Sequence, residues 1–187
     1  MKSPFQFIVK PVNGKRYDNT KKISGIDFIT STSQEDHKFS NRYAQVVSTP
    51  VNYSGPIQIN DTLLVHHNVF KFYYDMHGQE KSGKSFFKDD LFFIDNEQFF
   101  MYKHKDQWHA HDRYCFVKPV STEDSYIFKP FSEEPLVGVM KYPNNYLKLK
   151  GVKKGDKISF QPESEYEFIV DGEKLYRMFD HQIALLL

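Results

Sequence analysis

Cysteine is nearly absent from this sequence, with Cys115 the single one among 187 residues. One thiol excludes an internal disulfide framework and suits a reducing compartment. No uninterrupted apolar run approaches the ~18 residues that a membrane-spanning helix requires. The N-terminal stretch, MKSPFQFIVK, also lacks the long apolar core of a signal peptide. We therefore expect a cytoplasmic protein that has no membrane segment.

An excess of one charge is lacking too, because 25 Lys and Arg residues stand against 24 Asp and Glu residues. This balance gives no reason to expect a nucleic-acid partner. Alanine is scarce, whereas 18 Phe and 12 Tyr help to bring the aromatic share to 17%. Aromatic side chains are enriched in strands, so the composition predicts an all-β fold.

The last part of the chain shows the clearest strand pattern. Apolar and polar residues alternate around Ile158 and Phe160, and Asp171-Gly172 suits the positive φ angles of a tight hairpin. The final stretch, IALLL, is expected to form a buried strand. The expected strands are 157–160, 166–170, 174–179 and 183–187. Four short strands at this spacing predict a small barrel.

Several pieces of sequence recur in the same order, which indicates an internal duplication. FQFIVKPV near the N-terminus and YCFVKPV in the second half share a Phe-Ile/Val-Lys-Pro-Val core. The matched ranges are 5–12 with 114–120, 43–48 with 136–141, 57–65 with 151–160, 92–101 with 166–176, and 105–110 with 179–184. We therefore predict two domains of the same fold, 1–112 and 113–187.

The repeated unit resembles the GroES-type co-chaperonins. That family has a Val-x-x-Gly-Asp turn before an apolar strand, then a tight hairpin, then an acidic turn before the closing strand. The second copy carries Val152, Gly155-Asp156, Asp171-Gly172-Glu173 and Asp180 at these places. The resemblance implies two tandem GroES-like irregular β-barrels. It also implies a co-chaperonin, a homo-oligomeric ring that caps the chamber of an ATP-dependent chaperonin.

The first copy contains a long polar segment, 13–41, between its first two strands. Its low hydrophobicity predicts a mobile loop when the protein is alone. The segment holds one apolar cluster, formed by Ile23, Gly25, Ile26, Phe28 and Ile29. The resemblance implies that these residues dock on the chaperonin, although the acidic Asp27 departs from the family pattern. The alternative is a disordered surface loop with a strand-like patch.

The second copy has only a short segment, 121–134, at the corresponding place. It contains Tyr126, Ile127 and Phe128, which form a second and weaker candidate for docking. The segment is short and Pro130 and Pro135 bound it. We therefore favour core or edge strand for these three residues, with docking as the alternative.

The stretch 78–85, GQEKSGKS, fits the P-loop expression G-x-x-x-x-G-K-S. A working P-loop needs a strand before it and a helix after it, because the helix N-terminus binds the phosphates. Little length remains for a helix before the next strand. We expect the tip of an inserted hairpin at 73–88, and we keep nucleotide binding as a less favoured alternative.

A metal site and an enzymatic site are both unsupported by residue spacing. His104, His109, His111 and Cys115 lie near one another in sequence, but zinc needs four converging ligands. We expect structural histidines and a buried thiol, with no metal and no cofactor. No Ser-His-Asp, Cys-His or paired-carboxylate arrangement stands out, so we expect no catalytic residues.

These observations predict a non-enzymatic co-chaperonin, without a nucleic-acid or membrane partner. A second hypothesis keeps the same fold but makes the protein a structural or assembly component, for instance of a virus. The two hypotheses differ in whether protection of 13–41 from proteases depends on a chaperonin. The nucleotide-binding hypothesis differs from both, because it predicts ATP binding that is lost on Lys84→Ala.

Overall fold

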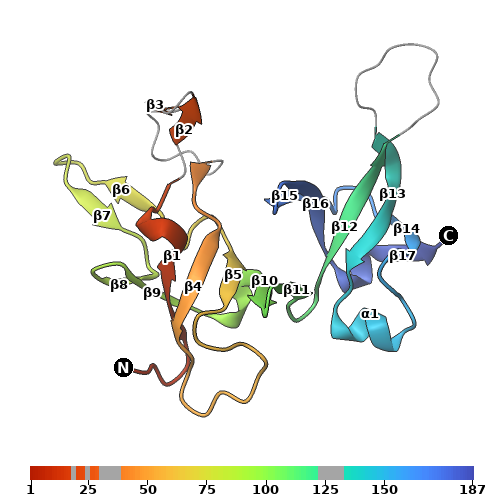
Figure 1. The fold of residues 1–187 in the computed structure, drawn as a ribbon, viewed down its shortest axis with the longest axis horizontal. Helices are drawn as coiled ribbons and strands as arrows, with labels where there is room; N and C mark the ends of the chain where they lie inside the picture. Colours follow the sequence, from red (N-terminus) through yellow and green to blue (C-terminus); the bar gives the residue numbers. More distant parts are fainter. Residues whose placement is uncertain (18–19, 24–25, 30–38, 122–132) are drawn as a thin grey trace. The chain divides into compact units, whose positions relative to one another are not determined.

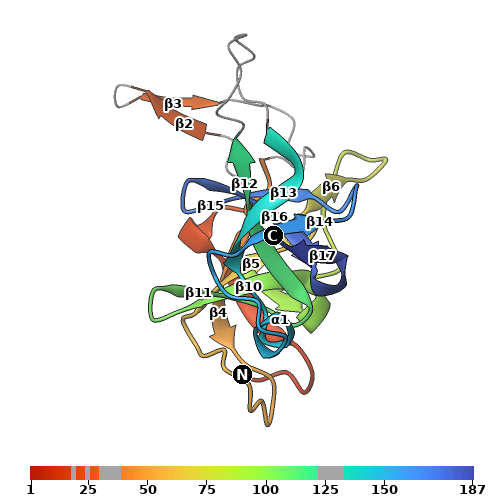
Figure 2. The same cartoon turned by 90° about the vertical axis from the view of Figure 1, so that its right-hand side faces the viewer.

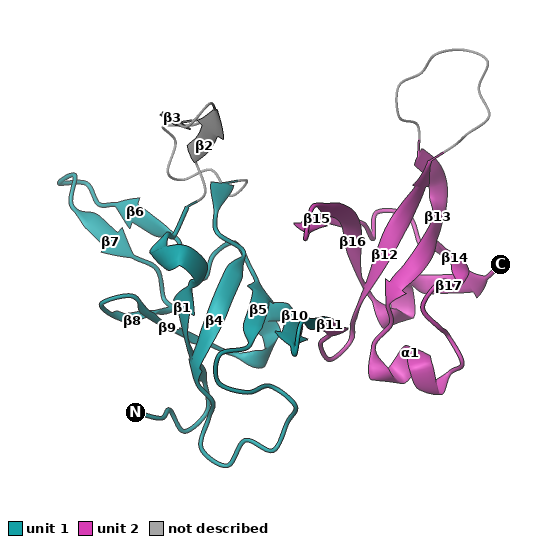
Figure 3. Ribbon diagram, viewed as in Figure 1, with its two compact units in different colours: residues 1–107 teal, residues 108–187 magenta. Residues whose placement is uncertain are grey.

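The computed structural model describes residues 1–17, 20–23, 26–29, 39–121 and 133–187. The chain divides into two compact units, 1–107 and 108–187, which Figure 3 distinguishes by colour. The sequence had placed this division between 112 and 113. Most of the regular structure is strand, and all sheets are antiparallel. The expected all-β class is therefore confirmed.

The seven-stranded sheet has the order β11-β10-β5-β4-β1-β9-β8, and all of its strands except β11 lie within unit 1. Its strands are β1 (Phe7–Pro11), β4 (Tyr43–Ser48), β5 (Thr62–Val65), β8 (Phe86–Lys88), β9 (Leu91–Ile94), β10 (Phe99–His104) and β11 (Gln107–Ala110). Two hairpins form separate small sheets, β2 (Thr20–Ile23) with β3 (Ile26–Ile29) and β6 (Phe72–Tyr74) with β7 (Glu80–Ser82). Short 3-10 turns lie at Val12–Gly14 and Asn96–Gln98.

Unit 2 is built on a six-stranded sheet with the order β15-β16-β12-β13-β14-β17. Its strands can be followed in Figures 1 and 2: β12 (Tyr114–Ser121), β13 (Glu133–Tyr142), β14 (Lys157–Phe160), β15 (Tyr166–Val170), β16 (Glu173–Phe179) and β17 (Ile183–Leu186). One helical turn, α1 (Asn145–Leu149), lies between β13 and β14, and a 3-10 turn lies at Asp180–Gln182. Strands occur at all four expected places in the last part of the chain.

The two sheets have the same strand order. Six strands of unit 1, β10-β5-β4-β1-β9-β8, correspond to β17-β14-β13-β12-β16-β15 of unit 2. The registers correspond as well, because Val9 pairs with Val46 next to an irregularity, and Val117 pairs with Met140 next to the same irregularity. The ladders that join β1, β4, β5, β9 and β10 thus repeat position by position in unit 2, whereas the β8–β9 pair has an irregularity that β15–β16 lacks.

The turn that precedes β5 in unit 1 and the turn that precedes β14 in unit 2 have the same hydrogen bond. The Asp61 carboxylate accepts a bond from the Gln58 amide at 2.7 Å, and the Asp156 carboxylate accepts one from the Lys153 amide at 2.8 Å. Asn60 has φ 74° where Gly155 has φ 97°. Asn tolerates this left-handed conformation better than most residues, which explains why it replaces glycine in unit 1.

Two of the predicted matches are wrong. The sequence paired 92–101 with 166–176, but β9 and β10 correspond to β16 and β17, so 92–101 corresponds to 176–185. The side chain of Gln98 accepts a bond from the Asp95 amide, as Gln182 does from the Phe179 amide. It follows that 179–184 matches 95–100 and not 105–110. The segments 95–100 and 105–110 both have a turn followed by a strand, and only the pairing of the strands shows which one corresponds to 179–184.

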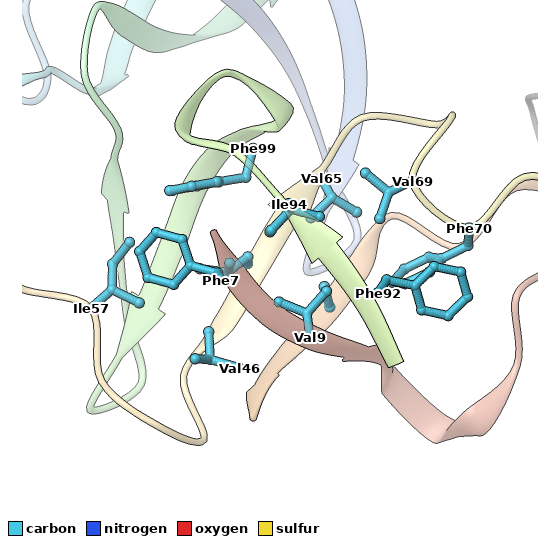
Figure 4. Close-up of a cluster of buried hydrophobic side chains, with 12 residues drawn as sticks. Phe7, Val9, Val46, Ile57, Val65, Val69, Phe70, Phe92, Ile94 and Phe99 are labelled. Carbon is cyan, nitrogen blue, oxygen red and sulfur yellow. The ribbon is translucent and has the colours of Figure 1, made fainter. Parts of the chain in front are cut away.

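The core of unit 1 is a cluster of buried apolar side chains from β1, β4, β5, β9 and β10 and from the connecting residues Ile57, Val69 and Phe70 (Figure 4). Edge-to-face contacts join Phe92 to Phe70 at 4.9 Å and Phe7 to Phe99 at 5.6 Å between ring centroids. The core of unit 2 is a separate cluster that includes Cys115, Met140, Ile158 and Met178. The outermost strands, β8 and β11 in one sheet and β15 and β17 in the other, pair on one side only among the described residues. The described strands therefore form no closed barrel.

Candidate functional site

The segment 13–41 leaves the sheet of unit 1 through a closed stem. An isolated antiparallel bridge joins Tyr17 to Ser40. The Asn41 side-chain amide donates to the Val12 carbonyl at 3.0 Å and to the Lys15 carbonyl at 2.7 Å. These bonds hold the two ends of the segment together at the end of β1.

The stem is also packed against the rest of unit 1. The Ser40 hydroxyl donates to the His67 carbonyl at 2.8 Å, and the Tyr17 ring meets the Phe72 ring edge-to-face at 5.1 Å. Tyr17 and Ser40 are both buried. The unit therefore fixes both ends of the segment, whatever the conformation of the residues between them.

The candidate docking residues lie on the β2–β3 hairpin. The register pairs Ile23 with Ile26, Lys21 with Phe28 and Thr20 with Ile29. Gly25 lies outside the described residues. Asp27 pairs with Lys22, so the acidic residue that departs from the family pattern stands opposite a basic one. Opposite charges at paired positions are compatible with a stable strand pair.

The weaker candidate in the second copy, Tyr126, Ile127 and Phe128, lies outside the described residues. Its segment leaves β12 and returns as β13, as 13–41 leaves β1 and returns as β4. The two candidate segments thus occupy the same place in the repeated topology. Whether they are mobile stays a prediction.

The stretch 78–85 lies in an inserted hairpin, as the favoured interpretation held. Gly78 adopts φ 73° in the turn, 80–82 is strand β7, and β8 follows at 86–88. The element after the motif is therefore a strand, and the helix N-terminus of a P-loop is not formed here. The strand–loop–helix arrangement of a P-loop is therefore absent at this stretch, and nucleotide binding stays a prediction.

His104 and the Cys115 thiol have defined environments. His104 Nδ1 lies 2.9 Å from the Asp61 carboxylate, and Cys115 is buried in the core of unit 2. Burial and, to a lesser extent, the charge of Asp180 raise the pKa of the Cys115 thiol to about 12. Within the ranges that the structure describes, no three His, Cys, Asp or Glu side chains gather as a metal site would require.

Strand β17 differs from the sequence expectation. The stretch IALLL was expected to be buried, but Leu185, Leu186 and Leu187 are 61, 54 and 63% exposed. The equivalent strand of unit 1, β10, has β11 on its outer edge, whereas β17 has no neighbour there among the described strands. The sequence did not predict this exposed edge, because an apolar run looks the same whether or not another strand pairs with its outer edge.

No protein-family model matches the chain, and no curated protein sequence matches it. None of the helices in the described part of the chain has the length and apolar character to span a bilayer.

Proposed function

We propose that this protein is a co-chaperonin, made of two tandem GroES-like units, that docks on a chaperonin through the β2–β3 hairpin. The observation that carries the proposal is a hairpin with four apolar residues (Ile23, Ile26, Phe28 and Ile29) on a closed stem, between the first two strands of a repeated sheet. The resemblance of the repeat to the GroES-type family supports it. The barrel closure of that family belongs to the proposal and is expected in the assembled protein.

The energetics favour several weak contacts over one strong contact. Burial of one apolar side chain such as Phe28 contributes about 1.5–3 kcal/mol. Ordering the segment on docking costs about 1 kcal/mol or more per residue. A single segment therefore binds weakly, and a ring that presents several copies converts weak binding into avidity. The proposal thus includes a homo-oligomeric ring.

The outer edge of β17 is where we place the contact between neighbouring chains of this ring. A strand edge with free backbone groups and exposed leucines is a template for pairing with another chain. Leu185→Lys puts a charge on this edge and should lower the mass measured by light scattering from that of a ring to that of one chain. A wild-type protein that is itself a single chain would refute the ring.

The docking test is capture by an ATP-dependent chaperonin in a pull-down. Phe28→Asp should abolish capture while leaving the circular dichroism spectrum unchanged, because the hairpin is a sheet of its own. Met76→Asp is the matched control, since Met76 lies on the other hairpin of unit 1 and is 99% exposed. Capture that survives Phe28→Asp would count against the docking assignment.

Limited proteolysis separates this proposal from a structural role in an assembly. A co-chaperonin predicts that cleavage within 18–38 is suppressed when chaperonin and nucleotide are added. An assembly protein predicts the same cleavage with and without them. The ATP chemistry belongs to the chaperonin, so the isolated protein should not hydrolyse ATP.

A further inference from the structure

The inserted hairpin β6–β7 gives unit 1 a feature that unit 2 lacks. The connection between β5 and β8 spans 66–85, whereas the equivalent connection between β14 and β15 spans only 161–165. The added residues line an open hollow of about 650 Å³ beside the 3-10 turn that contains Gln98. Drug-sized ligands occupy pockets of this size.

The lining of this hollow is cationic and rich in hydrogen-bond donors. It consists of Asn68, Lys71, Tyr73, Ser82, Gly83, Lys84, Ser85 and Gln98, and it includes no carboxylate. Neither Lys71 nor Lys84 forms an ion pair with any residue that the structure describes. Two lysines without a carboxylate in one concave site favour an anionic ligand.

Local hydrogen bonds shape the two sides of the hollow. The Gly83 amide donates to the Lys71 carbonyl at 2.9 Å, which joins the end of β7 to the segment before β6. A β-carbon at Gly83 would lie 3.1 Å from the same carbonyl, so glycine permits this close approach. Lys71 and Lys84 are thereby held on one short stretch of surface.

The two serines are arranged to donate. Ser85 Oγ accepts a hydrogen bond from Gln98 Nε2 at 3.2 Å, and Ser82 Oγ accepts one from Arg16 Nη1 at 3.1 Å. Each hydroxyl oxygen thus serves as an acceptor, and its own hydrogen can point at a ligand oxygen. Arg16 lies over the Phe86 and Phe92 rings at 5.0 Å, which adds a third fixed cation beside the site.

We propose that this hollow binds a phosphoryl oxyanion, held by Lys71 and Lys84 and by the hydroxyls of Ser82 and Ser85. Lysine ammonium groups bind phosphate as point charges, and charge-assisted bonds to its oxygens are strong. This mode differs from a P-loop, because the donors come from β7 (Ser82), from the residue before β6 (Lys71) and from the turn before β8 (Lys84 and Ser85), in place of a helix N-terminus. It is also independent of docking through the β2–β3 hairpin.

Isothermal titration of the full chain with pyrophosphate and with ATP tests the proposal at low and at physiological salt. Saturable binding that weakens as salt increases is expected, because an exposed charged site is screened. Equal affinity for the two probes would identify the free anion as the ligand. Tighter binding of ATP, lost on Tyr73→Ala, would identify a nucleotide whose base lies on the exposed Tyr73 ring. Absence of saturable binding by both probes would overturn the proposal.

Charge-removing variants localise the site. Lys71→Gln combined with Lys84→Gln should weaken binding at least tenfold, and a fold change near one would overturn the assignment. Lys148→Gln combined with Lys154→Gln removes the same charge from exposed positions of unit 2 and should leave affinity unchanged. An equal loss in this control would mean that net charge, and not the hollow, holds the anion. All four lysines are exposed, so circular dichroism should show unchanged folding.

Discussion

Gly138 offers a sharp test of the repeated packing, because the equivalent position in unit 1 is Ala44. A β-carbon at Gly138 would lie 2.3 Å from Val117 Cγ1 and 2.9 Å from the Lys118 carbonyl oxygen. The Phe160 ring lies 3.6 Å away, and its equivalent in unit 1 is the smaller Val65. The close contacts that an alanine would make are therefore those with Val117 and with the Lys118 carbonyl, because 3.6 Å from the Phe160 ring is an ordinary van der Waals distance.

We expect Gly138→Ala to destabilise the protein although alanine is natural in the other copy. Overpacking a core costs about 1–3 kcal/mol. Replacing glycine by alanine restricts the unfolded chain, and this stabilises by only about 0.4–1 kcal/mol. Gly138 is not in the left-handed region, so backbone strain adds nothing. With the middle of each range, the net loss is therefore about 1.3 kcal/mol.

Urea unfolding followed by circular dichroism measures this loss as a lower midpoint with an unchanged slope. Val117→Ala removes the clashing methyl group, so the double variant should be more stable than the sum of the two single effects predicts. A coupling of at least ~0.5 kcal/mol is expected for residues in contact. If Gly138→Ala equals or exceeds the wild type in stability, the packing argument fails.

The remaining predictions concern the two cores. Phe92→Ala should lower the free energy of unfolding by about 3–5 kcal/mol, because the ring is fully buried between Phe70 and Phe86; a loss below about 1 kcal/mol in urea unfolding would contradict this. Folding raises the Cys115 pKa from 9.0 to about 12, so the unfolded state loses its thiol proton first as pH rises. Its contribution to stability is complete below pH 9.0 and falls by up to about 1.4 kcal/mol per pH unit above it. Cys115→Ala should therefore show a shallower loss of stability between pH 9 and 10 than the wild type, and equal slopes would refute the assignment.

The duplication could be predicted from sequence because its signals are local. The Phe-Ile/Val-Lys-Pro-Val core predicts β1 and β12, and the turns at Asp61 and Asp156 predict the strands that follow them. The alternation of apolar and polar residues and the residue preferences of turns involve only a few neighbouring residues, so both can be recognised in the sequence. The same local reading recognised the hairpin at Asp171-Gly172 and the inserted hairpin around 78–85.

The candidate docking hairpin was predicted only in part. The apolar residues of 23–29 stand out against a polar segment, and sequence located them correctly between the first two strands. The pairing of Asp27 with Lys22 and the closed stem at Tyr17 and Ser40 did not follow from sequence. They depend on contacts between residues that are distant along the chain.

The sequence by itself was enough to predict an all-β fold, a duplicated structural unit and an apolar stretch inside a polar segment. The tertiary structure alone decided that 92–101 matches 176–185, that Leu185–Leu187 lie on an uncovered edge, and that Lys71 and Lys84 line one hollow. The reason is that propensity and periodicity are properties of neighbouring residues. Register, edge position and concavity depend on which distant strands pair, and hydrogen bonds across the sheet settle that choice.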